Sequence, residues 1–564
     1  MFIRVTSTPN SPRKSVKIVE SIREGFKVKQ KMLLHVGIAS DESEIEKLKQ
    51  IGIEFIAQEQ IRRKNESAQL DLFKHETVEE RLELVKMKCA SNRGRKPLIK
   101  LQDVTAEDKV SLSELVEENR VVEGIHDIAG PAYEKMGYSS LLKRKKDNEI
   151  LKDLVLMRLA NPSSKLKTQA LLDRKYSKTH DLDSIYRMMD KLLLKISDMK
   201  QVTFLSTKKL ISTPIDILFF DCTTLYFEST RVDELRKFGY SKDHRFNTTQ
   251  VVLALATNSD GLPIGYELFE GNKAEVNTLF ECIEYWKTKF NIESVCFVAD
   301  RAMMSDSNLK MLEDKKYQYI VAAKLRSLPK HLVSEIFSEK NYRIQAINGE
   351  AGWIGEFEYT QRRLVVSYKT GRAQRDAYQR NQILEKLKKR IGEKGDTKKL
   401  ITNQGVKKYT KTEESLTVID NSKIENDAAW DGLHGVITNI REQDASAILG
   451  RYAGLWRIEE SFRINKHTLS MRPIYHFKPE RIKSHIALCF MAFSVLRHME
   501  YHIKLTQKLS LEVLLDELTH VQASYYRHKP TNRLYRMPGK FSQTASKIYK
   551  SFRVERKNTA QVLV

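Results

Sequence analysis

Two aspartates follow apolar segments that have the composition of buried β-strands. Asp221 ends the run IDILFFD, and Asp300 ends SVCFVAD. A nearly continuous apolar run is typical of a strand buried on both faces, so each carboxylate is expected where its strand reaches the edge of a sheet. One such residue alone is more often a turn former or a helix cap. Two of them, joined by a third carboxylate from a later helix, would supply the oxygen ligands that Mg²⁺ prefers.

The third carboxylate is expected from residues 452–466, YAGLWRIEESFRINK, which have the pattern of an amphipathic helix. Tyr452, Glu459 and Lys466 are spaced by seven residues, and this spacing predicts one stripe of the helix. Arg463 follows Glu459 by four residues and is expected on the same face. A carboxylate among a phenol, an ammonium and a guanidinium suits a surface that holds a metal ion and phosphates. An exposed helix with internal ion pairs would have the same pattern.

Two neighbours of Glu459 have other expected roles. Glu460 points about 100° away around the helix axis, so it is the weaker candidate for a metal ligand. Trp456 has two interpretations, packing against the sheet or stacking on a nucleic-acid base, and the sequence leaves both open.

The composition indicates a multidomain protein with a polyanionic partner. The chain has 564 residues, which is too long for one compact core. Lys and Arg number 97 against 73 Asp and Glu, and the resulting net charge of +24 favours nucleic acid. A basic protein of the ribosome or of a membrane surface would have similar charge. The five cysteines include no CxxC pair, which argues against a zinc finger and suits a reducing cytoplasm. We therefore expect a cytoplasmic protein associated with the nucleoid, and no transmembrane segment or signal peptide is evident.

The segment SNRGRKPLIK contains a second basic motif. Arg93 and Arg95 flank Gly94, an arrangement similar to the arginine hooks that enter the minor groove of DNA. An ordinary basic linker would have the same sequence, so both interpretations stay open.

The pattern after residue 213 predicts the elements that must position the carboxylates. Strands, a hairpin turning at Asp260-Gly261, and two helices follow one another in the order strand, hairpin, helix, strand, helix, strand. This order predicts an α/β fold with a mixed sheet, compatible with a ribonuclease H-like core that a β-rich insertion interrupts. The predicted regions are a β-containing N-terminal region with a basic linker (1–100), a helical DNA-binding domain (101–212), the first part of the core (213–330), the insertion (331–440), the second part of the core (441–505) and a helical C-terminal region (506–564).

Taken together, these residues resemble the DDE transposases of bacterial insertion sequences. More narrowly, they are similar to the subgroup whose last motif reads Tyr, two residues, Arg, three residues, Glu, six residues, Lys, where Tyr452, Glu459 and Lys466 match. The following stretch RPIYHFKPERIKSHIALCF is also similar, and the resemblance covers roughly residues 215–505. Leu455 stands at the position of the motif Arg and cannot bind a phosphate. Candidates to replace it are Arg463 or, less favoured, Arg451 and Arg457.

The resemblance implies metal-dependent DNA cleavage followed by strand transfer. Two Mg²⁺ ions, or Mn²⁺, would be held by Asp221, Asp300 and Glu459. The resemblance also implies double-stranded DNA as the partner, both element ends and target, with the protein as a homodimer on the DNA. The residues expected to contact DNA are Tyr452, Trp456, Arg463, Lys466, Arg93 and Arg95.

Three other functions are compatible with parts of this pattern. A nuclease with the same core would cut DNA without joining it, and a transposase-derived DNA-binding protein would have lost catalysis. An RNA- or ribosome-associated basic protein would not account for the three matched carboxylates, all of which are present.

Overall fold

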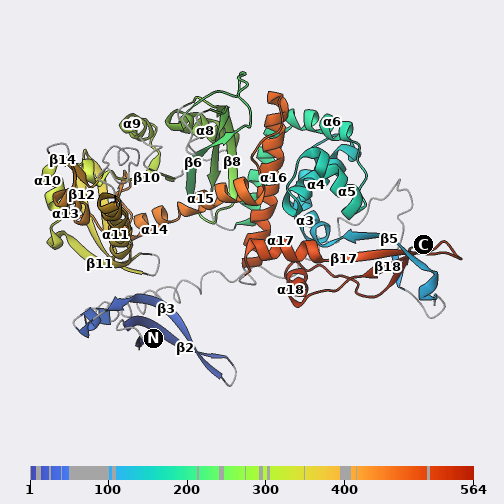
Figure 1. Ribbon diagram of the computed structural model, residues 1–564, viewed down its shortest axis with the longest axis horizontal. Coiled ribbons are helices and arrows are strands. Elements are labelled where there is room, and N and C mark those ends of the chain that lie inside the picture. Colours follow the sequence, from blue (N-terminus) through green and yellow to red (C-terminus); the bar gives the residue numbers. More distant parts are fainter. Residues whose placement is uncertain are drawn as a thin grey trace, which may run out of the picture. The chain divides into compact units, whose positions relative to one another are not determined.

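A computed structural model describes most of the chain in two compact units. The described residues are 2–7, 14–24, 27–39, most of 41–49, 101–103, 110–211, 215–239, 247–273, 275–290, 296–300, 305–347, 350–393, 408–413, 416–504 and 509–563. The first unit comprises Met1–Cys89 and Gln318–Ala453, and the second comprises Ala90–Tyr317 and Gly454–Val564. Figure 1 labels the elements of both. All three candidate carboxylates belong to the second unit.

The second unit contains a mixed sheet in the order β8-β7-β6-β9. The two pairs β6–β7 and β7–β8 are antiparallel, whereas β6 and β9 are parallel. The predicted hairpin is confirmed, and Gly261 in its turn has a φ of +76°, a left-handed conformation that favours glycine. The four strands are β6 (Ile217–Tyr226), β7 (Gln250–Thr257), β8 (Pro263–Glu270) and β9 (Cys296–Ala299).

Helix α8 (Glu275–Phe290) packs against this sheet and receives alternate side chains of β6. The rings of Phe220 and Trp286 lie 5.9 Å apart between centroids, and Cys222 Sγ lies 3.1 Å from Thr278 Oγ1. Successive side chains of a strand point to opposite faces. The side chain between Phe220 and Cys222, which is that of Asp221, therefore points away from α8.

Helices form the bulk of the second unit before β6, as the sequence predicts. The apolar helix α16 (Pro479–Lys504) packs against α3, α4, α6, α7 and β8, and Figure 1 shows it between the β6–β8 strands and the helices. Among the described helices, none combines the length and the apolar composition that crossing a membrane requires. The helices before β6 are α3 (Gly124–Lys135), α4 (Lys145–Ala160), α5 (Lys165–Tyr176), α6 (Leu182–Leu193) and α7 (Ile196–Leu210), and α9 (Asp306–Asp314) follows β9.

A second sheet of this unit corrects two sequence expectations. Residues 115–122, expected as helix, form β5 (Leu115–Val122), and the C-terminal region is not wholly helical, because it supplies β17 (Gln522–His528) as the partner of β5. That partner lies about 400 residues later in the chain, so no local pattern could indicate it. The remaining elements are β4 (Leu101–Asp103), α17 (Leu511–His520), β18 (Leu534–Pro538), α18 (Gln543–Ser551) and β19 (Gln561–Leu563), and the strand order is β4-β19-β18-β17-β5.

The first unit begins with three strands, in agreement with the β-containing N-terminal region that the sequence predicts. β1 (Phe2–Ser7), β2 (Lys14–Glu24) and β3 (Lys27–Ala39) pair antiparallel in sequence order. Alternate residues of β2 and β3 form a small core of Val16, Ile18, Leu34 and Val36.

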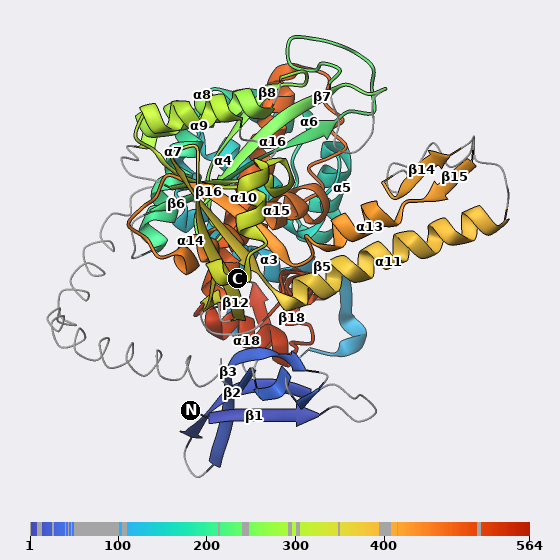
Figure 2. The ribbon, with the colours of Figure 1, turned by 90° about the vertical axis from the view of Figure 1, so that its left-hand side faces the viewer.

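The inserted part of the first unit is mixed rather than β-rich. It contains the antiparallel hairpin of β12 (Glu350–Tyr359) and β13 (Arg362–Tyr368), and β13 pairs with the strand β16 (Leu433–Thr438). The part that differs from a β-rich insertion is α11 (Thr370–Glu393), a 24-residue helix. Figure 2 shows α11 beside α13 and the β14–β15 hairpin, and Leu387 of α11 is buried there with Tyr409. The other elements are β10 (Gln318–Ala322), α10 (Lys330–Ile336), β11 (Tyr342–Ile347), β14 (Thr410–Glu413), β15 (Leu416–Ile419), α13 (Asn421–Ala428) and α14 (Ala445–Ala453).

Candidate active site

Asp221 of β6 and Asp300, the residue directly after β9, occupy neighbouring positions on two parallel segments. The register pairs Phe220 of β6 with Ala299 of β9, and each aspartate is the next residue in its chain segment. Adjacent strands lie about 4.8 Å apart, so the two aspartates are neighbours across the sheet. β9 ends at Ala299, whereas β6 continues to Tyr226, which corrects the expectation that both aspartates end their strands.

The two aspartates differ in their surroundings. Asp221 is half-buried, and its Oδ1 accepts a hydrogen bond from the backbone N–H of Cys222 over 2.7 Å. Asp300 is exposed where β9 stops. One carboxylate therefore lies half-buried within β6, and the other lies exposed just beyond the end of the neighbouring strand β9.

Helix α15 (Trp456–Arg463) carries Glu459 and packs against β6 and β7. Its buried residues are Ile458, Ser461 and Phe462. Glu459 follows Ile458 by one residue, which is about 100° around the helix, so it lies at the margin of the buried face. Its side chain is exposed, as are those of Trp456 and Arg463 three residues before and four after it. These three residues form an exposed stripe on the helix that contacts the strand of Asp221.

The segment 452–466 is not the single helix that the sequence predicts. α14 ends at Ala453, Gly454 and Leu455 form a turn, and after α15 the chain enters a π-helix over Ile464–Thr468 that contains Lys466. The expectation of one stripe for Tyr452, Glu459 and Lys466 is therefore wrong. The physical reason is that seven-residue spacing indicates a common face only in an uninterrupted α-helix.

Asn465 lies in the π-helix, and its side chain forms a hydrogen bond with the preceding helix α15. Its Nδ2 donates to the carbonyl of Ser461 over 2.9 Å, and its own carbonyl accepts the N–H of Met471 over 2.9 Å. Asn465 is buried, whereas the neighbouring Lys466 is half-buried. Single π-turns inside helices are frequent at functional sites.

Tyr452 belongs to the first unit and packs within it. It lies on the last turn of α14, and its ring contacts that of His434 with centroids 5.0 Å apart. Arg451 beside it is half-buried.

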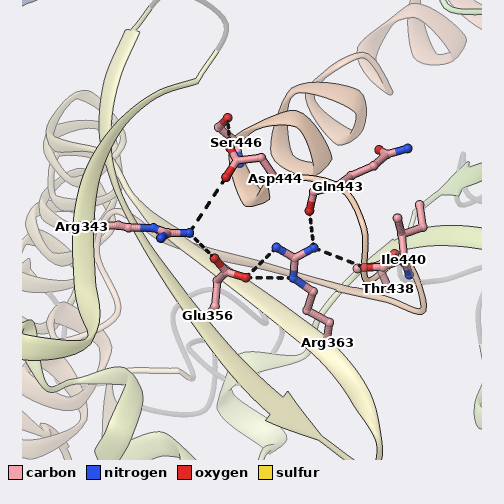
Figure 3. A network of polar contacts seen from close by, with 8 residues as sticks. All are labelled: Arg343, Glu356, Arg363, Thr438, Ile440, Gln443, Asp444 and Ser446. Carbon is pink, nitrogen blue, oxygen red and sulfur yellow. Dashed lines mark hydrogen bonds and ion pairs between the residues drawn. The ribbon is translucent and has the colours of Figure 1, made fainter. Parts of the chain in front are cut away.

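A polar network fixes the start of α14 in the first unit (Figure 3). Arg363 of β13 is buried and donates to Glu356 of β12 from Nε over 2.9 Å and from Nη2 over 2.6 Å. Its Nη1 also donates to the carbonyl oxygens of Ile440 and Gln443, over 3.3 and 2.5 Å. Asp444 then caps the first turn of α14, where its Oδ2 accepts the N–H of Ser446 over 3.0 Å. The β12–β13 hairpin thereby positions the helix that carries Tyr452.

Glu460 makes contacts that differ from those of Glu459. Its Oε2 accepts a hydrogen bond from Nη1 of Arg497 over 3.1 Å, and its Oε1 lies 3.7 Å from Nη2 of Arg463. Arg497 lies on α16 and is only 2% exposed, and its Nε donates to the carbonyl of Gly261 over 2.9 Å. Glu460 thus attaches α15 to α16 and to the β7–β8 turn. It is therefore poorly placed to bind a ligand from solution.

Leu455, which stands at the position of the motif Arg, and the residues near it in the chain differ in their burial. Leu455 is 6% exposed and packs in the core, so it presents nothing to a ligand. Arg463 is exposed, whereas Arg457 is half-buried with its guanidinium 5.4 Å from the ring centroid of Trp456. Burial lowers the pKa of Arg457, and the nearby Asp260 opposes that shift. Trp456 is 51% exposed, which is against the interpretation as a core residue.

The oxygen atoms of the three carboxylates are suitable ligands for a divalent metal ion. The three side chains are not, however, close enough together to bind one ion as they stand. In the part of the chain that the structure describes, no three His, Cys, Asp or Glu side chains lie together closely enough to hold a metal ion. Asp221 and Asp300 are neighbours on the sheet, and Glu459 lies on the helix packed against it. Arg93 and Arg95 lie outside the described residues.

Comparison with known proteins gives two family matches. Residues 212–495 match the model of the transposase DDE domain, and residues 3–63 match that of the N-terminal domain of the IS1634 family of transposases. A search of curated proteins found no significant match.

Two solved structures are among those similar to the chain. One is the cryo-EM structure of the piggyBac transposase synaptic complex with hairpin DNA, at 11% identity over 70% of this chain and 77% of that chain, with a TM-score of 0.35. The other is the Mos1 transposase paired-end complex with the left transposon end, at 15% identity over 35% of this chain and 62% of that chain, with a TM-score of 0.14.

Proposed function

Because this chain belongs to the DDE transposase family, we propose that it binds the ends of an insertion sequence, cleaves a DNA strand there and joins the freed end to target DNA. The observation that carries this proposal is the register of β6 and β9, which makes Asp221 and Asp300 neighbours across the sheet. The order β8-β7-β6-β9, with three antiparallel strands and a fourth parallel to the first, supports a ribonuclease H-like core.

Asp221, Asp300 and Glu459 are the proposed ligands of two Mg²⁺ ions, with Mn²⁺ as the alternative metal. Metal ions bound there would activate the attacking hydroxyl and stabilise negative charge on the leaving 3′ oxygen. The protein's own contribution is the placement of the carboxylates. Asp221 is oriented by the N–H of Cys222, and Glu459 is carried by a helix that Glu460 and Arg497 attach to the core.

The exposed stripe of α15 is the proposed surface for the DNA backbone. Arg463 would take the role of the motif Arg that Leu455 lacks, because it is the exposed guanidinium on the same stripe as Glu459. Trp456 and Lys466 would contact the same strand, and Tyr452 of α14 is a further proposed DNA contact. The net charge of +24 supports double-stranded DNA as the partner, with two copies of the protein on paired ends.

The test is incubation of the purified protein with linear DNA that carries the flanking element ends, with and without Mg²⁺, followed by mapping of 3′ ends. We expect Mg²⁺-dependent nicks at the element boundary and, with pre-cut ends, joining to a target plasmid. Cleavage without joining would favour a nuclease. Binding without either reaction would favour a DNA-binding protein that has lost catalysis.

A further inference from the structure

The loop between the π-helix and α16 presents two aromatic rings to solvent. We call residues 472–478, RPIYHFK, the aromatic loop. Tyr475 is 64% exposed and Phe477 is 65% exposed, whereas Ile474 is buried and His476 is half-buried. One side of the loop therefore packs against the protein, and the other side exposes the rings of Tyr475 and Phe477 to solvent. Two large aromatic side chains exposed two positions apart form an apolar surface, and such surfaces often mark the binding site of a partner.

The backbone of the aromatic loop is fastened to the segment that follows β6. Arg236 is fully buried, and its Nη2 donates to the carbonyl of Phe477 over 3.0 Å while its Nε donates to Asp233 over 2.7 Å. At the other end of the loop, the guanidinium of Arg472 lies 4.9 Å from the ring centroid of Tyr226. Tyr226 is the last residue of β6, the strand that contains Asp221. The loop is therefore tied to the same strand as the proposed active site.

The inward side of the aromatic loop packs on the helical region. The rings of His476 and Tyr186 of α6 meet edge to face with centroids 6.3 Å apart. Arg481 covers the ring of Tyr186 at 4.5 Å and pairs with Asp190 over 3.2 Å. Contacts on both sides hold the backbone in place, so Tyr475 and Phe477 project from a fixed support.

The charge around the aromatic loop complements phosphate groups. Residues 461–479 contain no Asp or Glu, and their Lys and Arg residues are Arg463, Lys466, Arg472 and Lys478. Cations that follow a phosphate backbone, combined with rings that offer flat faces, are the features with which proteins bind single-stranded nucleic acid. A paired base inside a duplex has both faces covered by its neighbours. The rings therefore suit unpaired nucleotides rather than intact duplex.

We propose that the aromatic loop is a stacking platform, on which Tyr475 and Phe477 bind unpaired bases of single-stranded DNA. The inference deepens the proposed function, on which it depends, by assigning a binding site for strands that are separated beside the cleavage position. It differs from the contacts of the α15 stripe, which serve the backbone of the cleaved strand.

The test is a binding titration in EDTA, so that cleavage is not required. The probes are a short duplex with blunt ends and the same duplex with an oligo(dT) overhang that contains 2-aminopurine. The full-length wild-type protein is expected to bind the overhang probe more tightly and to change the 2-aminopurine fluorescence. Replacing Tyr475 and Phe477 together by Ala should weaken overhang binding about 5- to 150-fold and abolish the fluorescence change, with blunt-duplex affinity within about twofold.

The matched control is Tyr378→Ala, which removes a ring that is 66% exposed on α11 and should leave both affinities unchanged. Tyr475→Phe with Phe477→Tyr retains both rings and should retain overhang binding. Unchanged overhang binding by the double Ala variant overturns the proposal, as does an equal loss for both probes. If the double Ala variant changes its oligomeric state in light scattering while overhang binding stays intact, the proposal is also overturned. The two rings would then form a contact with a second copy of the chain. Wild-type binding of blunt duplex alone refutes the platform and leaves the proposed function standing, whereas binding of neither probe refutes both.

Discussion

Arg497 donates a hydrogen bond to Glu460 over 3.1 Å, and the two residues lie 37 positions apart on helices that the sequence gives no reason to pair. The bond gives the adjacent acids of α15 different roles. Glu460 is 21% exposed in its side chain and pairs with Arg497, whereas Glu459 is exposed and forms no ion pair within the described part of the chain. An acid that is held by a buried cation stabilises the helix, and its neighbour stays accessible to a ligand.

Removing Arg497 is expected to destabilise the second unit strongly. Arg497→Met leaves Glu460 and Glu500 without their shared cation, and loss of one partner of a buried pair costs about 3–5 kcal/mol. The free energy of unfolding can be measured by urea denaturation. Arg463→Ala is the control, since the Arg463 side chain is 62% exposed in its 3.7 Å pair with Glu460 and should contribute about 0–1 kcal/mol. Equal effects of the two variants would contradict the role assigned to Arg497.

Glu459→Gln and Glu460→Gln are expected to separate catalysis from stability. The first should reduce cleavage to about a hundredth or less with an unchanged melting temperature, because a proposed metal ligand is lost. The second should lower the free energy of unfolding by about 1–3 kcal/mol and retain cleavage, because it weakens a buried charged hydrogen bond. Gel-based cleavage and thermal melting measure the two effects. The reverse pattern would assign the metal to Glu460.

Asp221→Asn and Asp300→Asn are each expected to abolish cleavage while binding to element ends survives. Both substitutions keep size and remove the charge that a metal ion requires. Cleavage assays and fluorescence anisotropy at fixed salt check the two properties. Full cleavage by either purified variant would exclude that residue from the site.

Arg463→Ala is expected to weaken DNA binding in a salt-dependent way. If this guanidinium holds a phosphate in place of the missing motif Arg, the slope of log affinity against log salt should fall by about 1, and cleavage should decrease. The control Arg375→Ala removes another exposed cation, one that lies on α11. An unchanged slope for Arg463→Ala would leave the role of the motif Arg to another residue.

Stability is expected to fall as the solution is acidified below neutrality. Burial lowers the pKa of His498 from its usual 6.5 to about 4. The unfolded chain therefore binds a proton more readily than the folded chain between these values. The contribution of the neutral His498 to the free energy of unfolding is fully present above pH 6.5 and is lost as the pH falls toward 4. At pH 5 the contribution lost is about 2 kcal/mol.

This pH dependence can be tested by urea denaturation between pH 7.5 and 5. His498→Gln removes the titrating group, and its decrease in stability should be shallower than that of the wild type. His331→Gln alters an exposed histidine and should behave as the wild type does. Identical slopes for all three proteins would show that His498 does not titrate in this range.

The sequence predicted those parts of the site that depend on local pattern. The strands before Asp221 and Asp300 are continuous apolar runs, and the hairpin is indicated by Asp260-Gly261, so the sheet could be anticipated. The side-by-side placement of the two aspartates required the β6–β9 register, which no local pattern contains.

The parts that were missed depend on distant partners or on a broken helix. Glu460 is distinguished from Glu459 only by Arg497 on another helix, and β5 is a strand only because β17 pairs with it. The turn at Gly454 and Leu455 interrupts a pattern that the seven-residue spacing presented as continuous. Gly454 was the available signal, since glycine is unfavourable inside a helix.

The pairing of β5 with β17 has a consequence for synthesis of the chain. Val122 pairs with Gln522, so the edge strand near the start of the second unit has no partner until 400 further residues have been translated. At about 5–20 residues per second this interval lasts roughly 20–80 s. A nascent or prematurely terminated polypeptide would carry the helices α3–α7 with an open sheet edge. Active protein would therefore arise only after the ribosome has translated β17.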